Sequence, residues 1–358
     1  MAPGTTRVLP DCPVWNIRST QTPRAGTAFS YGRASSSSCG LIVPDAALYW
    51  SEDSHPLPRR GPMYETLGLE IPPRAASVGL ALVLGLVFGI LAERTAFCLR
   101  RALVGVDRPA ALAVWLSALA AAVFGTQAAV AAGLVSFDDH RFHSDTLPLA
   151  ILVLGGLMFG AGMVLARGCA SRLTVLAGTG NLRALVGIVT FALFAQATLR
   201  GVFAPLRTRL AEFSVDIPST LPFGALPWLA LVAVVALWAI LRGGRQPGRL
   251  AMAAVLGLLV PLGWVGTGYV LYDDFDPIAL ESLSFTAPAA ETLFWSGAST
   301  AVPATFGTGL IGGVLLGALA ASLLAGSFRW QSFDSPAQTG GSLGGGALMG
   351  VGGVLAGG

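Results

Sequence analysis

The sequence contains little charge and no lysine. Only 11% of its 358 residues are charged, all 22 basic residues are arginine, 54% of residues are hydrophobic, and the mean hydropathy is +0.69. Soluble domains carry roughly 25% charged residues, so this composition excludes an ordinary soluble protein. The net charge of +3 is scattered among loops and does not indicate a nucleic-acid-binding surface.

Motifs for metal, cofactor or nucleotide binding are also missing. The four cysteines form no CxxC pair and no His/Cys cluster, so zinc and iron–sulfur sites have no support, and we expect neither a metal nor a cofactor. Because no GxxxxGK[ST] motif occurs, the sequence argues against ATP hydrolysis within this chain. Two of the cysteines, Cys12 and Cys39, lie in a polar N-terminal stretch, whereas Cys98 and Cys169 end apolar segments.

Residues 1–75 differ from the rest of the chain. They are rich in serine, proline, arginine and glycine and show no apolar periodicity, so we predict a disordered N-terminal extension. The continuous apolar run of a signal peptide does not occur there. Met63 opens MYETLGLEIPPR just before the first apolar segment and is an alternative start of translation. Residues 76–358 form the predicted transmembrane domain.

Apolar segments of membrane-spanning length recur along residues 76–358. About 20 apolar residues in a helix cross a hydrocarbon core of roughly 30 Å, and open strands would leave backbone groups unpaired in lipid. The pattern therefore predicts an all-α polytopic membrane protein. The predicted segments are 76–92, 110–135, 148–167, 182–204, 224–241, 250–271, 304–326 and 341–358.

The loops between these segments alternate in charge. Arginines gather in loops 93–108 and 242–249, whereas acidic residues gather in loops 136–146 and 272–291. The positive-inside rule puts the arginine-rich loops in the cytoplasm and the N-terminus outside. His140 and His143 lie with three aspartates in an acidic loop, where a solvated pair is a more common interpretation than a metal site.

An internal repeat relates residues 155–168, GGLMFGAGMVLARG, to residues 345–358, GGALMGVGGVLAGG. Eight of the fourteen aligned positions are identical. Under the loop assignment the two segments cross in opposite directions, and inverted repeats of Gly-interrupted segments indicate a transporter's central site. A weaker echo pairs residues 85–101 with 313–329, matching Gly85 with Gly313 and Gly89 with Gly317.

Cys169 is the sharpest chemical candidate. We predict that Gly168 ends one helix and that another begins near Ala170, with Ser171 as its N-cap. Free amides at that N-terminus, together with Arg167 and Arg172, suit a small anion, particularly a sulfur-bearing one that a thiol contacts. The alternative is a buried structural cysteine beside two interfacial arginines that snorkel.

Cys98 ends the first apolar segment within AERTAFCLRR. Glu93 and Arg94, just before it, form either an intramembrane pair or merely the interfacial end of a helix. Arg100 and Arg101 are typical of anchors at a cytoplasmic interface.

These motifs resemble those of the YeeE/YedE family of membrane sulfur transporters. The family's opening GxxxGxxxQRGRFC element is similar to GLVFGILAERTAFCLRRAL, and its first GC motif to FGAGMVLARGCASRLTVLAGTGNLRALV. Its second half begins with a sequence similar to LESLSFTAPAAETL, and its C-terminal element is similar to GGSLGGGALMGVGGVLAGG. The resemblance covers residues 78–358 and implies an inverted-repeat, hourglass-like bundle of short Gly-interrupted or re-entrant helices in the bacterial cytoplasmic membrane.

The resemblance also implies a function. Thiosulfate or a related sulfur oxyanion would pass between the thiols of Cys98 and Cys169, and a small soluble TusA-like sulfur carrier is an expected partner besides the lipid bilayer. The expected pore residues are Cys169, Cys98, Arg167, Arg172, Gly168, Ser171, Glu93 and Arg94.

The chain departs from the family motifs at several positions. ERTAFC stands where the family has QRGRFC, and ARGCASR stands where its best-known members have AGGCATG. The chain stops at Gly358, where the repeat predicts a cysteine next, so we expect a C-terminally truncated record. The alternatives to a permease are a membrane-embedded thiol/disulfide oxidoreductase and a non-functional truncated fragment.

Overall fold

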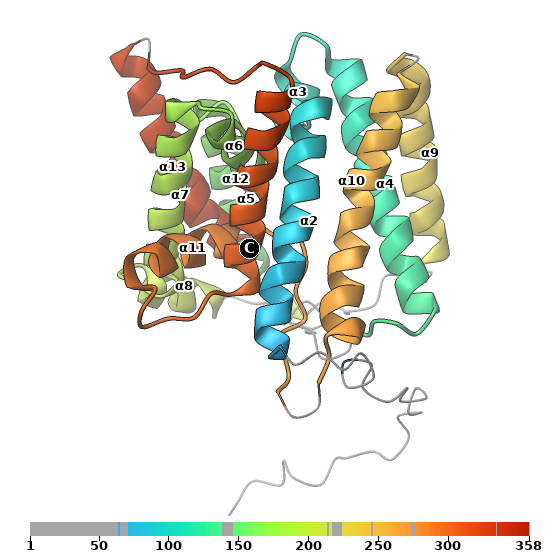
Figure 1. The fold of residues 1–358 in the computed structure, drawn as a ribbon, viewed down its shortest axis with the longest axis horizontal. Helices are drawn as coiled ribbons and strands as arrows, with labels where there is room; N and C mark the ends of the chain where they lie inside the picture. Colours follow the sequence, from blue (N-terminus) through green and yellow to red (C-terminus); the bar gives the residue numbers. More distant parts are fainter. Residues whose placement is uncertain are drawn as a thin grey trace, which may run out of the picture. The chain divides into compact units, whose positions relative to one another are not determined.

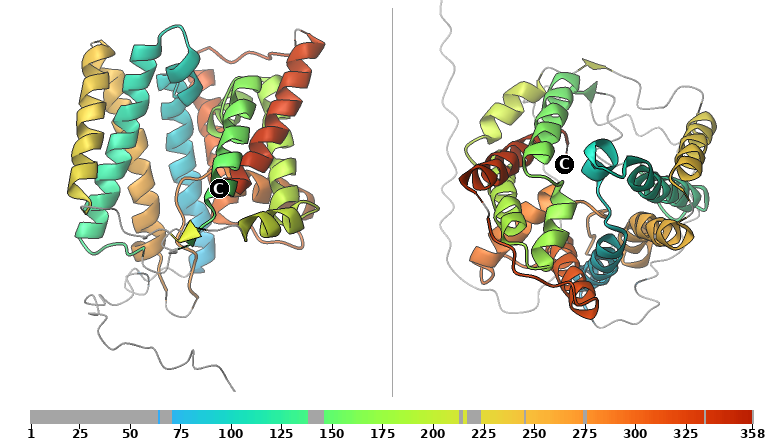
Figure 2. Two further views of the ribbon diagram at one scale, coloured as in Figure 1. Left: turned by 180° about the vertical axis from the view of Figure 1, so that it is seen from behind. Right: turned by 90° about the horizontal axis from the view of Figure 1, so that it is seen from above.

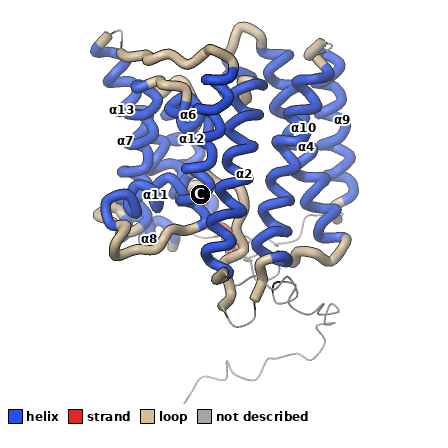
Figure 3. Tube along the Cα trace, viewed as in Figure 1, coloured by secondary structure: helices blue, strands red, loops and turns tan. Residues whose placement is uncertain are grey.

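The computed structural model describes residues 64, 71–137, 146–212, 215–216, 224–244, 246–273, 276–333 and 335–357, all within one unit, Pro56–Gly358. Almost all of them are in helices or connecting loops (Figure 3). Cys12, Cys39, His140 and His143 lie outside the described residues, as does nearly all of the predicted extension.

Eight longer helices correspond one to one to the eight predicted apolar segments. They are α2 (Pro73–Thr95), α4 (Arg108–Ala131), α5 (Leu149–Leu165), α7 (Leu182–Leu199), α9 (Leu226–Arg242), α10 (Pro247–Val265), α12 (Phe306–Leu324) and α13 (Pro336–Leu355). Proline stands in the first turn of five of them, where its missing N–H has no helical partner to lose. All eight predicted segments are therefore helical.

Shorter elements connect these helices. They are α3 (Leu99–Val104), α6 (Ala170–Gly178), α8 (Ala204–Ala211), α11 (Thr286–Ala298) and a π-helical turn, η2 (Gly266–Val270), that extends α10. Two strands of two residues each, β1 (Thr146–Leu147) and β2 (Val215–Asp216), pair antiparallel. The sequence predicted no strands, and these four residues leave the protein all-α.

The described helices include six that are long and apolar enough to cross a membrane. These spans are Pro73–Val104, Arg108–Ala131, Leu149–Gly178, Leu182–Leu199, Pro247–Val270 and Phe306–Leu324. Many large apolar side chains on them are exposed, such as Leu157 at 68% and Val83 at 60%, as expected for surfaces that face lipid. The chain is a polytopic membrane protein.

The central helix pair, α2 and α12, packs through glycines with both chains running in the same direction (Figure 1). A Cβ built on Gly85 would lie 2.3 Å from the Leu310 carbonyl oxygen, and one built on Gly317 would lie 2.1 Å from that of Leu86. Small residues spaced by four allow such close backbone approach in membranes. The weaker echo therefore relates two parallel neighbours that pack through their matched glycines.

Helices α5 and α13 carry the stronger repeat and pack antiparallel. A Cβ on Gly162 would lie 2.6 Å from the Gly345 carbonyl oxygen, and one on Gly155 would lie 2.8 Å from that of Gly352. The repeat equates Gly155 with Gly345 and Gly162 with Gly352, so Gly155 contacts the equivalent of Gly162, and Gly162 contacts the equivalent of Gly155. Such swapped contacts are the signature of a pseudo-two-fold axis. The inverted orientation of this pair is confirmed.

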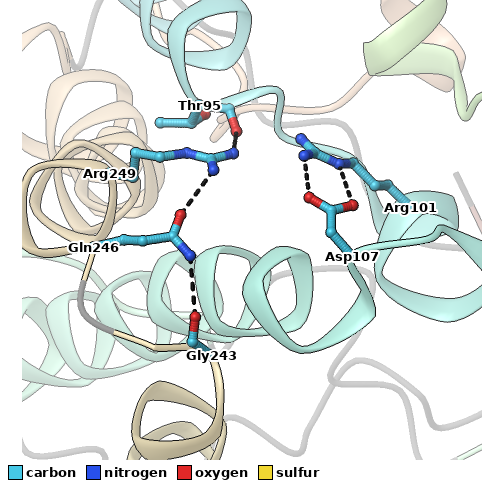
Figure 4. A network of polar contacts seen from close by, with 6 residues as sticks. All are labelled: Thr95, Arg101, Asp107, Gly243, Gln246 and Arg249. Atoms are coloured by element: carbon cyan, nitrogen blue, oxygen red, sulfur yellow. Dashed lines mark hydrogen bonds and ion pairs between the residues drawn. The ribbon is translucent and has the colours of Figure 1, made fainter.

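The helices fall into two groups about α2 and α12. Helices α5, α7 and α13 lie on one side, and α4, α9 and α10 lie on the other (Figure 2). The two arginine-rich loops meet at one end of the bundle, where the Arg249 guanidinium donates a 2.8 Å hydrogen bond to the Thr95 carbonyl (Figure 4). Arg74, at the opposite end of α2, pairs with Asp276 of the acidic loop at 3.3 Å. The predicted separation of loop charge is therefore present.

Candidate functional site

Two helix breaks share one backbone design. Helix α2 ends in the left-handed residue Ala96 (φ 51°), and the Phe97 N–H donates to the Ala92 carbonyl. Helix α5 ends likewise at Arg167 (φ 59°), with the Gly168 N–H donating to Met163. Both are Schellman-type endings. A cysteine in extended conformation follows each break.

Each cysteine is the N-cap of a short helix. Cys98 (φ −166°) precedes α3, and Cys169 (φ −78°) precedes α6. The prediction that a helix begins near Ala170 is confirmed, but Ser171 is not its N-cap. Ser171 already lies in the first turn of α6, so its hydroxyl cannot cap that helix and instead lies 3.3 Å from the Cys169 sulfur.

The two thiols come together although 70 residues separate them. The side chains of Cys98 and Cys169 interact directly, and both cysteines are free and only partly buried. The fold therefore brings together the two cysteines that the sequence singled out. The two thiols come from two different spans, Pro73–Val104 and Leu149–Gly178.

An ion pair links the same two breaks. Arg172 Nη1 in the first turn of α6 lies 3.3 Å from Glu93 Oε2 in the last turn of α2, and the two side chains are 16% and 23% exposed. Glu93 therefore pairs with Arg172 and not with its neighbour Arg94. Residues one apart on a helix point in different directions, which is why the first of the two alternatives, a Glu93–Arg94 pair, does not form.

The remaining predicted site residues lie around this centre. Gly168 is buried, whereas Arg94 and Arg167 are exposed. Arg167 occupies a left-handed position that costs a residue with a Cβ about 1 kcal/mol or more. Arg167 therefore lies in the turn that positions Cys169 at the start of α6.

Sequence reasoning missed an aromatic wall. The Phe88 ring of α2 packs against Phe97 at 6.4 Å and against Phe285 at 5.3 Å between ring centroids. Phe285 also contacts the apolar cluster in which Cys169 packs. Phe285 lies in the SFTAP segment, residues 284–288. Only the packing connects this segment to the cysteines, because no local sequence pattern relates the two.

Arg249 is a second residue that the sequence did not single out. Its guanidinium donates to the Thr95 carbonyl and, at 2.7 Å, to the Gln246 side chain (Figure 4). It thereby satisfies a carbonyl left free at the end of α2. In the same region Arg101 binds both carboxylate oxygens of Asp107 and so lowers the pKa of that exposed carboxyl below its usual value.

Comparison with known proteins agrees with this architecture. A family model described as sulphur transport matches residues 94–358. The thiosulfate transporter TsuA of Escherichia coli (strain K12) is 26% identical over 77% of this chain and 83% of its own length. The thiosulfate transporter TsuA of Spirochaeta thermophila is 29% identical over 77% of this chain and 87% of its own length. With a match across most of the chain and a bundle of membrane-spanning helices around two cysteine breaks, this protein belongs to the sulphur-transport family of bacterial multi-pass membrane proteins.

Proposed function

We propose that this protein is a permease that carries thiosulfate or a related small sulfur-containing anion across the cytoplasmic membrane through a path lined by Cys98 and Cys169. The observation that carries the proposal is the meeting of two free thiols at two equivalent helix breaks. The similarity to two thiosulfate transporters supports the choice of substrate.

The site offers an anion several weak interactions in place of water. A thiol is a weak donor, so neither cysteine alone holds the anion strongly. The first amides of α6 have no helical acceptor and add a positive partial charge, and Arg172 adds a full one. Successive groups that each replace part of the anion's hydration shell let the anion enter the path without binding so tightly that it cannot leave, and conduction requires both.

A second candidate function is a membrane thiol/disulfide oxidoreductase. The direct contact between Cys98 and Cys169 favours it, because such an enzyme needs two cysteines able to pair. The names of the relatives favour transport instead, so we take the protein to be a carrier rather than an enzyme. The two functions differ in whether the thiols must change oxidation state.

The test is uptake of radiolabelled thiosulfate by proteoliposomes. We expect wild-type protein to support uptake above protein-free vesicles, and Cys169→Ala to lose most of it. Cys12→Ala and Cys39→Ala, outside the transmembrane domain, serve as matched controls that keep uptake. Unchanged uptake by Cys169→Ala would reject the thiol path, and quinone reduction lost in that variant would instead support the oxidoreductase.

We also propose a small soluble TusA-like sulfur carrier as a cytoplasmic partner. The arginine-rich end of the bundle supports this, since Arg94 and Arg108 are exposed there and attract an acidic surface. Salt-dependent binding of such a carrier to detergent-solubilised protein tests it, and binding that Arg94→Gln and Arg108→Gln leave unchanged contradicts the use of this face.

A further inference from the structure

We infer that Glu93 is an internal counter-anion of Arg172 that the transported anion must displace, so that this ion pair sets which anions pass. The inference rests on the proposed transport function and assigns a specificity-determining residue within it. Glu93 lies five residues before Cys98, and Arg172 lies three residues after Cys169. The 3.3 Å ion pair therefore spans the two breaks at the thiols.

Neither charge suits its own helix. Glu93 sits in the last turn of α2, where the helix dipole is negative, and Arg172 sits in the first turn of α6, where it is positive. Each side chain is thus repelled by its own helix end and held mainly by the other. An anion that binds Arg172 gains the attraction of the guanidinium and of the α6 amides together.

Other charges near the pair do not replace either partner. Arg249 bonds the Thr95 carbonyl and Gln246, and Arg101 is occupied by Asp107. Arg94 and Arg167 are exposed. With both side chains mostly buried, removal of one partner leaves the other charge uncompensated, and an incoming anion is the natural substitute.

The two residues are also paired departures from the motifs that the chain resembles. Glu93 stands where QRGRFC has glutamine, and Arg172 stands where AGGCATG has glycine. The carboxylate and the guanidinium at these two positions meet each other in the fold. Together they leave the net charge of the site unchanged while they add an exchangeable anion-binding group.

A tethered carboxylate competes with any incoming anion at high effective concentration. A dianion such as thiosulfate gains more from Arg172 than a monoanion does, and so displaces Glu93 more readily. The ion pair therefore filters against monoanions. Without Glu93, Arg172 is open to both classes.

The experiment compares thiosulfate uptake by proteoliposomes, and its inhibition by the monoanion thiocyanate, among Glu93→Gln, Arg172→Gln and the double variant. We expect Glu93→Gln to lower the half-saturating thiosulfate concentration about three- to tenfold and to make uptake sensitive to thiocyanate, the range expected for loss of one competing ion pair. Arg172→Gln raises that concentration most, because it leaves the Glu93 carboxylate uncompensated beside the thiols, and the double variant recovers part of that loss because the carboxylate is gone as well.

Controls separate specificity from folding. Arg209→Gln changes an exposed charge on α8, outside the site, and leaves both readouts as in wild type, and Glu93→Asp restores the thiocyanate resistance that Glu93→Gln loses. A Glu93→Gln protein with wild-type uptake and thiocyanate resistance overturns the inference alone. The inference is also overturned if Glu93→Gln and Arg172→Gln both lose uptake and thermal stability together, because the ion pair then only stabilises the fold. Wild-type protein without thiosulfate uptake overturns the proposed function as well.

Discussion

The break at Cys98 and the break at Cys169 share a backbone design and differ in the charged residues that flank the thiol. Each consists of a left-handed residue, one linking residue and an extended cysteine at the start of a short helix. The first carries a neutral Ala96 and the carboxylate of Glu93, whereas the second carries Arg167 and Arg172. The turn therefore places the thiol, and the flanking side chains set the local charge.

Packing of α5 on α13 holds the second break, and its loss is expected to have the largest effect on stability. Gly162→Ala places a Cβ 2.6 Å from the Gly345 carbonyl oxygen, whereas Gly160→Ala, in the same helix, meets nothing within 4 Å. We expect Gly162→Ala to lower the free energy of unfolding in detergent by about 2 kcal/mol, as for overpacked cores. Gly160→Ala is the control, and equal stability of the two variants contradicts the packing.

Glycine substitutions at the two left-handed positions separate the effect of the turn from the effect of the charge. Arg167→Gly and Ala96→Gly each relieve a positive φ, at 59° and 51°. We expect each to raise the free energy of unfolding by about 0.5–1 kcal/mol. Only Arg167→Gly also removes a positive charge beside Cys169, so only it is expected to weaken thiosulfate uptake. An equal loss of uptake in Ala96→Gly shows that the turn, not the charge, matters for transport.

The smallest expected effect concerns Asp107, between α3 and α4. Arg101 lowers the pKa of this carboxyl in the folded state, so the pair stabilises the fold above the carboxyl's usual pKa and loses that contribution as the pH falls through the lowered value. Since Asp107 is exposed, the contribution is below about 1 kcal/mol. Thermal unfolding of Asp107→Asn and wild type, which differ at neutral pH, should converge at acid pH, and a difference independent of pH contradicts this role.

Local signals predicted the helices and the strongest repeat. Uncharged runs marked the eight helical segments. The matched spacing of Gly155 and Gly162 with Gly345 and Gly352 identified α5 and α13 as the inverted repeat, because their close packing requires those glycines. The other glycine echo marks a close contact of a different kind, because the glycines of α2 and α12 allow parallel packing.

The site itself was only half visible in the sequence. Gly168 marked the second break in the sequence, although Arg167 takes the left-handed position there, whereas the first break has no glycine and Ala96 takes that position. Glu93 and Arg172 are 79 residues apart, and no local pattern connects them. Arg249 looked like an ordinary loop charge, because its role depends on the free carbonyl of a helix distant in sequence.

The most direct test of the shared thiol path is protection of Cys98 and Cys169 from alkylation. The rate at which N-ethylmaleimide modifies each cysteine is measured by mass spectrometry in reconstituted wild-type protein, with thiosulfate or with sodium chloride of equal ionic strength, and Cys12 and Cys39 serve as internal references. We expect thiosulfate to slow the modification of Cys98 and Cys169 together and to leave both references unchanged. Protection of only one of the two, or of neither, in protein that takes up thiosulfate would contradict a path between the two thiols.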